Sequence, residues 1–317
     1  MDKPFLTVDE QVRLLERRGV ETQPETPRIL LREGYYSVVN GYKAPFLDAS
    51  ASEKAGEDRY RQGTTFDAIY GLFEFDRALR ELTFHYLIRA EATTRTAISY
   101  CFSEAHKEPE DYLLQSSYCS RKEFEAYGHG TKSYADEISN LTGILGRRAK
   151  TSGAEFVSHY RDKYGAVPLW VLCNDLTFGN LEHFFNLMKP NEKKSVCKAI
   201  ATSTQRRGDK SLGYFDPLRA KVCLEVLVKT RNICAHDERL YCARVGGRKD
   251  VNYVKMVWML ERFLTPDEFV DFLDELLSLL QRQADRHEAV AHVLTSIGFF
   301  ELRDEIKKRF LTRTSGE

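Results

Sequence analysis

The stretch that decides the fold is residues 65–101, which read TFDAIYGLFEFDRALRELTFHYLIRAEATTRTAISYC. Its apolar residues recur at spacings of three and four, which is the pattern of one face of an α-helix. Asp67 lies in the first turn, where a negative charge favours the N-terminal end of the helix dipole. We therefore expect a long helix here, and a break or bend near Thr83 is the alternative for so long a run.

The segments on either side of this stretch carry helical signals too. Upstream, Thr7 and Glu10 fit a capping box, and Gly19 follows as a stop signal. Downstream, Pro217 suits the start of a helix that we expect to reach about Arg239, and further amphipathic runs follow toward the C-terminus. The alternation that is typical of strands is nearly absent. The predicted fold is therefore all-α.

The pattern divides the chain into three segments. Residues 1–62 form an N-terminal helical extension that ends in a polar loop, residues 63–245 form a helical core, and residues 246–317 form additional C-terminal helices packed on that core. The 317 residues, 42% of them hydrophobic, suffice for one large domain or two modest ones.

The composition narrows the kinds of partner. Lys plus Arg and Asp plus Glu both number 47, so the net charge is zero and gives no overall signal for nucleic acid. Any RNA binding must therefore use a local basic patch. The stretches with Arg147, Arg148 and Lys150 and with Arg206, Arg207 and Lys210 are interpreted as solvated faces or loops where local RNA contacts can be tested.

The cysteines and the termini indicate the compartment. The seven cysteines are scattered, and no C-x-x-C pair or zinc-type spacing occurs, so we expect reduced thiols and no metal or cofactor. The N-terminal sequence lacks the apolar region of a signal peptide, and no apolar run is long enough to cross a membrane. The sequence predicts a soluble, cytoplasmic protein.

The strongest candidate for chemistry is the segment 231–239, RNICAHDER, near the end of the predicted helix from Pro217. Asn232 and His236 are four residues apart and share a helix face, and Arg239 extends their stripe. Arg231 lies one step around the helix, from which its long side chain can reach the stripe. Such polar groups on a packed helix need internal partners or a bound anion.

These residue types suit the cleavage of RNA at its own 2′-hydroxyl. His236 supplies a general base or acid that titrates near neutral pH. Arg231 supplies a permanent charge that clamps the scissile phosphate, and Asn232 orients the histidine or the phosphate. No metal is required. From the spacing alone, a histidine on a helix is more often structural than catalytic.

The sequence around the motif carries a resemblance. RNICAHDERL at 231–240 resembles the Arg-Asn-x-x-x-His signature of the HEPN superfamily of helical ribonucleases. More narrowly, the chain resembles the Abi-like proteins of bacterial abortive infection, the group that contains AbiD and AbiF. The other segments that carry this resemblance, in the family's order over roughly residues 3–242, are KPFLTVDEQVRLLERRGV, GYYSVVNGYKAPF, GTTFDAIYGLFEFDRALRELTFHYLIRAEATTR and VPLWVLCNDLTFGNLEHFF.

The resemblance implies a HEPN-like helical bundle core and an endoribonuclease that is toxic to its host during phage infection. It implies catalytic roles for Arg231 and His236 and a supporting role for Asn232. It also implies a homodimer in which two copies of the motif face each other, and control by a cognate partner, which for some members is a small RNA. RNA is thus the expected partner, with neither DNA nor a membrane expected.

Other residues have two interpretations. Arg77 and Arg80, in FDRALR, are interpreted as parts of salt bridges that orient the core helices, and the alternative is that they line an RNA cleft with Arg239. Glu91 and Arg95 are four apart and can pair on the same helix.

The motif itself has two rival interpretations. In the first rival, a non-catalytic HEPN module binds RNA or a nucleotide without cutting it. In the second, a scaffold buries the motif as a polar contact between helices, which predicts that His236 is inaccessible.

Outside the motif, Trp170 is expected to anchor the core.

Overall fold

The regular structure of this protein is helical. A computed structural model describes residues 4–128, 133–208, 210, 212–245, 251–286 and 288–314. In these ranges no strand occurs, and the only extended pairings are isolated bridges between Glu21 and Thr65 and between Leu47 and Tyr60. The prediction of an all-α fold is confirmed.

The helices form two compact units. The first comprises Met1–Leu82, Asp237–Ala243 and Leu273–Glu317, and the second comprises Thr83–His236 and Arg244–Phe272. Each unit collects segments that are far apart in the sequence, so the three segments expected from the sequence stay a prediction.

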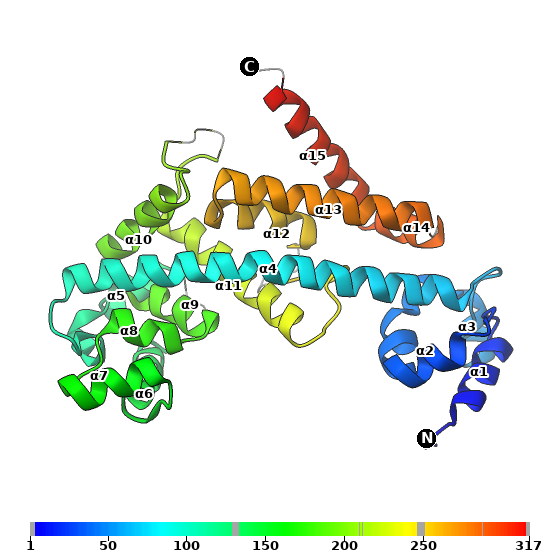
Figure 1. The fold of residues 1–317 in the computed structure, drawn as a ribbon, viewed down its shortest axis with the longest axis horizontal. Coiled ribbons are helices and arrows are strands. Elements are labelled where there is room, and N and C mark those ends of the chain that lie inside the picture. The colour runs from blue at the N-terminus through cyan, green and yellow to red at the C-terminus, as the bar shows by residue number, and fades with distance from the viewer. Residues whose placement is uncertain are drawn as a thin grey trace. The chain divides into compact units, whose positions relative to one another are not determined.

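The stretch quoted at the outset forms a single helix, α4 (Phe66–Ala105). Figure 1 shows this helix as one uninterrupted ribbon, so the alternative of a break near Thr83 is wrong. The helix has a buried residue at most steps of three and four along its length, which fits its periodic sequence.

The first unit combines the N-terminal and C-terminal helices. Its elements are α1 (Val8–Arg17), α2 (Thr26–Glu33), η1 (Tyr36–Asn40), η2 (Ala44–Phe46), α3 (Ala49–Ala55), the first part of α4, the end of α13 (Pro266–Arg286), α14 (Glu288–Ser296) and α15 (Phe299–Thr314). The rings of Phe75 and Phe299 meet edge to face with centroids 5.7 Å apart. The N-terminal and C-terminal segments therefore share one core in this unit.

A capping box and a glycine set the ends of the first two helices. The capping box is confirmed, because the Thr7 backbone N–H donates to Glu10 Oε2 at 2.7 Å and the Glu10 N–H donates to Thr7 Oγ1 at 3.4 Å. The helical sequence that follows divides into two elements. Gly34 has φ +85°, a conformation that suits glycine and stops a helix, so α2 ends there and the π-helical turn η1 follows.

The second unit is built around α11. Its elements are the remainder of α4, η3 (Asp111–Leu113), η4 (Gln115–Ser117), α5 (Arg121–Ala126), α6 (Tyr134–Thr151), α7 (Glu155–Tyr164), α8 (Leu169–Leu172), η5 (Cys173–Asp175), α9 (Phe178–Leu187), α10 (Pro190–Ser203), α11 (Pro217–Ala235), α12 (Tyr253–Leu260), η6 (Glu261–Phe263) and the start of α13. Helix α11 packs against α9, α10 and α12. This packing fixes the helix that carries the candidate site.

The cysteines and the hydropathy of the helices complete the description. None of the seven cysteines, all of which lie in the described ranges, forms a disulfide. Burial raises the pKa of the Cys223 thiol to about 11, so this group stays protonated near neutral pH and acts as a packing residue. Within the described ranges, every helix is too short or too polar to cross a membrane.

Candidate active site

The hexapeptide 231–236 lies at the C-terminal end of α11. The helix starts at Pro217, and the Asp216 carboxylate caps it by accepting the backbone N–H groups of Leu218 and Arg219 at 2.9 and 3.0 Å. Leu224 and Leu227 are fully buried along its length. A helix capped at one end and packed along three neighbours holds its other end in a defined position.

Helix α11 ends four residues earlier than the sequence predicts, at Ala235 rather than at about Arg239. The backbone N–H of His236 donates to Asn232 O at 2.9 Å, which closes the last turn. Asp237 then adopts φ +56°, the left-handed conformation that ends helices and that Asp tolerates better than most residues. Arg239 is therefore not on the helix, and the predicted stripe of Asn232, His236 and Arg239 is wrong in its last member.

The Arg231 guanidinium is held by a buried carboxylate on α4. Its Nε lies 3.5 Å from Glu91 Oε2, an electrostatic contact without hydrogen-bond geometry. Glu91 also accepts a hydrogen bond from Arg95 Nη2 at 2.7 Å, which confirms the predicted pair on that helix. A buried carboxylate with two arginines beside it is fully compensated, and the cluster keeps an excess of positive charge.

Arg231 retains an accessible edge. Its side chain is 25% exposed, and its Nη1 donates a hydrogen bond of 3.4 Å to the neighbouring Asn232 Oδ1. The guanidinium thus uses Nε inward, toward Glu91, and keeps its terminal nitrogens near the surface. This arrangement suits the binding of an anion such as a phosphate.

Asn232 and His236 are both exposed, one turn apart at the end of α11. Because His236 is exposed, the scaffold interpretation, in which the motif is buried between helices, is wrong. In the described chain no side chain hydrogen-bonds or ion-pairs with the His236 imidazole. Both ring nitrogens are therefore open to a ligand, and proton transfer to or from that ligand is sterically allowed.

A groove of about 580 Å³ lies beside Arg95, the second arginine on Glu91. Its walls include Tyr100 and Trp170, whose side chains are 62% and 49% exposed. The expectation that Trp170 anchors the core is wrong, because α8 buries its other three residues, Leu169, Val171 and Leu172, and leaves the indole on its exposed face. Exposed rings beside an arginine form a surface on which unpaired bases can stack.

The other predicted arginines belong to the first unit, where Arg80 is buried. Its Nη1 donates to Asp76 Oδ2 at 2.8 Å and to the Tyr42 hydroxyl at 3.1 Å, and its Nη2 pairs with Asp237. Asp76 further accepts the backbone N–H of Tyr241 at 2.7 Å. This closed network fits the salt-bridge interpretation of Arg80, and the alternative, in which it lines an RNA cleft, has no support from its burial.

The network has a clear electrostatic signature. Burial raises the pKa of Asp76 above its usual value, while the donors from Tyr42 and Arg80 act in the opposite direction. Burial also raises the pKa of the Tyr42 hydroxyl, and the neighbouring Asp76 charge adds to that shift. The phenol therefore stays protonated and donates to the carboxylate at 2.7 Å.

Arg77 and Arg239 are engaged by neighbours in the same unit. Arg77 forms a two-nitrogen contact with Glu33, at 2.6 and 3.3 Å, and lies over the Phe73 ring at 4.5 Å from its centroid. Arg239 is exposed, and its Nη1 donates to Gly41 O at 2.9 Å. For Arg77 the pairing fits the structural interpretation.

Sequence reasoning missed the role of Glu91 at the motif. The spacing of Glu91 and Arg95 identified the pair on α4, but no local signal indicates that α11 brings Arg231 to the same carboxylate. That contact joins residues 140 positions apart, so it depends on how the helices pack. In the described part of the chain, no three His, Cys, Asp or Glu side chains are grouped so as to hold a metal ion.

A known family covers most of this chain. The family described as Abi-like protein matches residues 28–242, a range that contains the motif, Glu91 and Arg95. Neither the curated proteins nor the solved structures include a significant match to this chain.

Proposed function

Because the chain belongs to the Abi-like protein family, we propose that it acts in bacterial abortive infection as a metal-independent endoribonuclease of the HEPN type. It works in the cytoplasm, where its RNA substrate is found. One observation carries the proposal: Arg231, charge-paired with the buried Glu91, shares its helix end with the exposed His236. A fixed cation and an accessible imidazole at one helix end are the two groups that this reaction requires.

The reaction is an internal transfer at phosphorus. The 2′-hydroxyl oxygen bonds to the adjacent phosphorus while the bond from phosphorus to the 5′-oxygen breaks. One proton leaves the 2′-hydroxyl for a base, and one is given to the 5′-oxygen by an acid. The products are a 2′,3′-cyclic phosphate and a 5′-hydroxyl, and neither water nor a redox partner is consumed.

Each group has a role in this step. His236 transfers a proton as base or acid, and such catalysis contributes typically ~10²–10⁴-fold. Arg231 neutralises the charge that develops on the phosphate oxygens, with its terminal nitrogens toward solvent. Asn232 lies beside the guanidinium and orients it through the 3.4 Å hydrogen bond.

The reaction favours two copies of the site. One imidazole cannot serve as base and acid in the same step, and each chain contributes a single His236. A twofold symmetric dimer supplies the second imidazole and a second Arg231 with one interface. We therefore include a homodimer with a composite cleft in the proposal, together with control by a cognate partner such as a small RNA.

The groove beside Arg95 supports unpaired RNA as the substrate. Tyr100 and Trp170 offer exposed rings for bases, and Arg95 shares Glu91 with Arg231. Stacking on aromatic side chains requires bases that are free of a duplex. Single strands and loops are therefore the proposed targets.

The test uses purified full-length protein and an end-labelled single-stranded RNA in the presence of EDTA. We expect the wild type to cut, and His236→Ala and Arg231→Ala to lose ~10²-fold or more of the rate. His236→Ala leaves the thermal stability almost unchanged, because an exposed side chain contributes within ~0.5 kcal/mol. Arg231→Ala keeps the fold, because Glu91 retains its 2.7 Å hydrogen bond from Arg95. His159→Ala, a change at another exposed histidine of the same unit, is the matched control and keeps the wild-type rate.

Three outcomes contradict all or part of the proposal. Undiminished cutting by His236→Ala removes the histidine from the mechanism. Equal growth of cells that express the wild type and His236→Ala favours the rival function, a HEPN module that binds RNA or a nucleotide without cutting it. Loss of cutting in EDTA alone contradicts only the metal-independent chemistry.

A further inference from the structure

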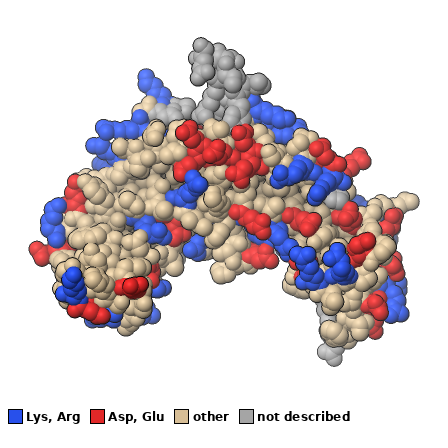
Figure 2. All heavy atoms as spheres, viewed as in Figure 1, with Lys and Arg blue, Asp and Glu red and all other residues tan. Residues whose placement is uncertain are grey.

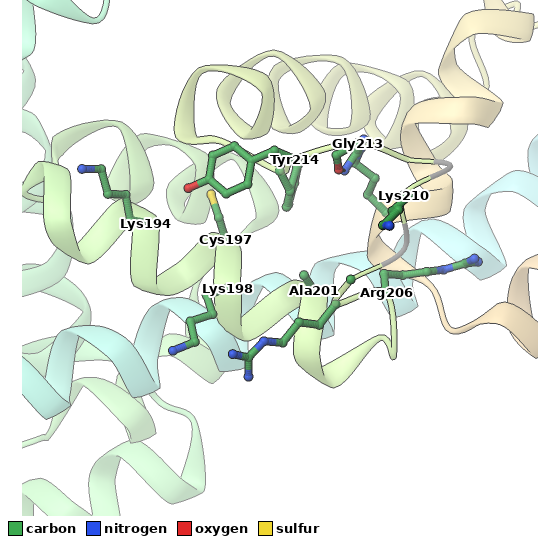
Figure 3. Close-up of a pocket in the computed structure, with 12 residues that line it drawn as sticks. Lys194, Cys197, Lys198, Ala201, Arg206, Lys210, Gly213 and Tyr214 are labelled. Atoms are coloured by element: carbon green, nitrogen blue, oxygen red, sulfur yellow. The ribbon is translucent and has the colours of Figure 1, made fainter.

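A second site of the same unit has the chemistry of an anion-binding pocket. It has a volume of about 470 Å³ and lies between α10 and the loop that joins α10 to α11. None of the motif residues lines it. Figure 3 shows Lys194, Cys197 and Lys198 on α10, with Gly213 and Tyr214 on the loop.

The described lining of this pocket is strongly basic. Six of its side chains are cationic and none is acidic: Lys194, Lys198, Arg206, Arg207, Lys210 and Arg262. Figure 2 shows Lys and Arg side chains gathered over α10 and the loop that follows it. Since the whole chain has zero net charge, this is a local excess of the kind that RNA binding by a neutral protein requires.

Two of the six cationic side chains bind other parts of the protein and so hold the walls of the pocket. Arg206 is buried, lies 3.6 Å from Glu261 and donates to Leu264 O at 3.4 Å, so it anchors the start of the loop. Arg262 donates to Gly213 O at 3.3 Å and lies over the Phe215 ring, so it anchors the end. Both ends of the loop are thereby held in place before any ligand arrives.

The other four cations are exposed and have no ion-pair partner among the described residues. Lys194 and Lys198 are four residues apart on α10 and therefore project from one face, about 6 Å apart along the helix axis. Arg207 and Lys210 come from the loop. Adjacent like charges repel each other, and an extended polyanion relieves that repulsion.

One aromatic side chain completes the site. Tyr214 is 75% exposed at the rim, although Phe215 next to it is buried against Phe263. The Arg219 guanidinium donates a hydrogen bond of 3.4 Å to Tyr214 O and so holds the backbone at this position. An exposed ring beside exposed cations is the arrangement by which proteins bind single strands, with stacking for a base and cations for the phosphates.

From these observations we infer that the pocket between α10 and Tyr214 binds a single-stranded segment of RNA through its phosphates, at a site separate from Arg231 and His236. The choice of RNA rests on the proposed function. The exposed, spread cations favour a strand over a single nucleotide, because a site for one phosphate group concentrates its donors at one point.

The experiment measures binding without cleavage. The probe is a fluorescent oligouridine of about 12 nucleotides, within the ~4–16 nucleotides of single-strand sites, with 2′-O-methyl groups that prevent attack by the 2′-oxygen. At about 0.1 M salt, Lys194→Glu with Lys198→Glu weakens binding about tenfold or more and lowers the slope of log affinity against log salt by about 1.4. Arg147→Glu with Lys150→Glu, two exposed cations on α6, is the matched control with less than about twofold change.

Tyr214 provides the second arm. Tyr214→Ala weakens binding about fivefold to a hundredfold, which corresponds to ~1–3 kcal/mol for one stacked base, and Tyr214→Phe keeps the wild-type affinity. Equal losses in both double variants overturn the inference, since they report only total charge. Full displacement of the probe by stoichiometric ATP also overturns it, in favour of a mononucleotide site.

The outcomes separate this inference from the proposed function. If the pocket variants lose binding but no form of the protein cuts RNA, the result supports RNA binding at the pocket and contradicts the proposed nuclease activity. If the α10 double variant binds and cuts RNA as the wild type does, the result supports the proposed nuclease activity and contradicts RNA binding at the pocket.

Discussion

Helix α4 carries the same pattern twice: an acidic residue followed four positions later by an arginine, as Asp76 with Arg80 in the first unit and as Glu91 with Arg95 in the second. The two pairs have similar geometry, at 2.8 and 2.7 Å. Their surroundings differ. Asp76 is fully buried and accepts further hydrogen bonds from Tyr42 and from the backbone. Glu91 receives one more cation from the residues that the structure describes, Arg231.

The difference shows what separates a structural ion pair from a candidate site. Around Asp76 the donors of Leu240 and Tyr241 end on the carboxylate. The buried Arg80 divides its donors between Asp76 and Asp237, so its charge does not face a ligand. Around Glu91 one carboxylate serves two guanidinium groups that are each about a quarter exposed. The first cluster is therefore expected to control stability, and the second to control activity.

The largest expected effect is on the closed cluster. Asp76→Ala leaves the Arg80 charge buried and removes the acceptor of the Tyr241 backbone N–H. Breaking a buried, hydrogen-bonded ion pair costs about 3–5 kcal/mol, so the free energy of unfolding falls by that amount. Urea unfolding followed by circular dichroism measures it. Glu81→Ala, at an exposed position of the same helix, is the control. A loss below about 1 kcal/mol shows that the cluster is not the structural anchor described here.

The next effect is on the open cluster and concerns activity. Glu91→Gln removes the charge that holds Arg231, and misplacement of a catalytic group by about 1 Å lowers rates by up to ~10²-fold. RNA cleavage under single-turnover conditions measures the effect, with Glu81→Gln as the isosteric control on α4. Glu91 is a positioning residue in this scheme, since it contacts Arg231 and not the substrate.

A double-mutant cycle distinguishes positioning from general destabilisation. If Glu91 acts through Arg231, Glu91→Gln has no further effect on the rate once Arg231→Ala is present. Additive losses of rate mean that Glu91 acts on the fold as a whole. The two clusters then have the same role, and the comparison between them fails.

Local signals account for the parts of the fold that the sequence predicts well. The capping box at Thr7 and the periodicity over 65–101 depend on residues within a few positions of each other, and both are confirmed. The early end of α11 follows from Asp237, whose left-handed backbone accompanies its ion pair with Arg80. That pair joins residues 157 positions apart, and no helix signal contains it.

The candidate site divides in the same way. The residue types and the family resemblance identify Arg231 and His236, while the roles of these residues stay a prediction. The partners of these residues are set by packing. The sequence therefore indicates only the local pair of Glu91 with Arg95, and not the contact of Glu91 with Arg231. Exposure is also a property of packing, which is why Trp170, an apolar residue in an apolar segment, was expected in the core.

The smallest of the three effects concerns the Tyr42 hydroxyl in the closed cluster. Tyr42→Phe removes its 2.7 Å hydrogen bond to Asp76 and leaves the other donors in place. A hydrogen bond to a charged group contributes about 1.5–3 kcal/mol, and the remaining donors bring the expected loss to the lower end of that range. Urea unfolding of Tyr42→Phe at neutral pH measures it, and cleavage of RNA stays unchanged.

The pH dependence of that loss tests its cause. Burial raises the pKa of Tyr42 in the folded protein above the ordinary tyrosine value of 10.0, so the folded state holds this proton more tightly than the unfolded state does. The stability that Tyr42 contributes is therefore complete below pH 10 and decreases as the pH rises toward the folded pKa. The difference in unfolding free energy between the wild type and Tyr42→Phe should shrink above pH 10. A difference close to zero at neutral pH means that Tyr42 stabilises the cluster by ring packing on Phe73, which phenylalanine retains, and not through its hydroxyl.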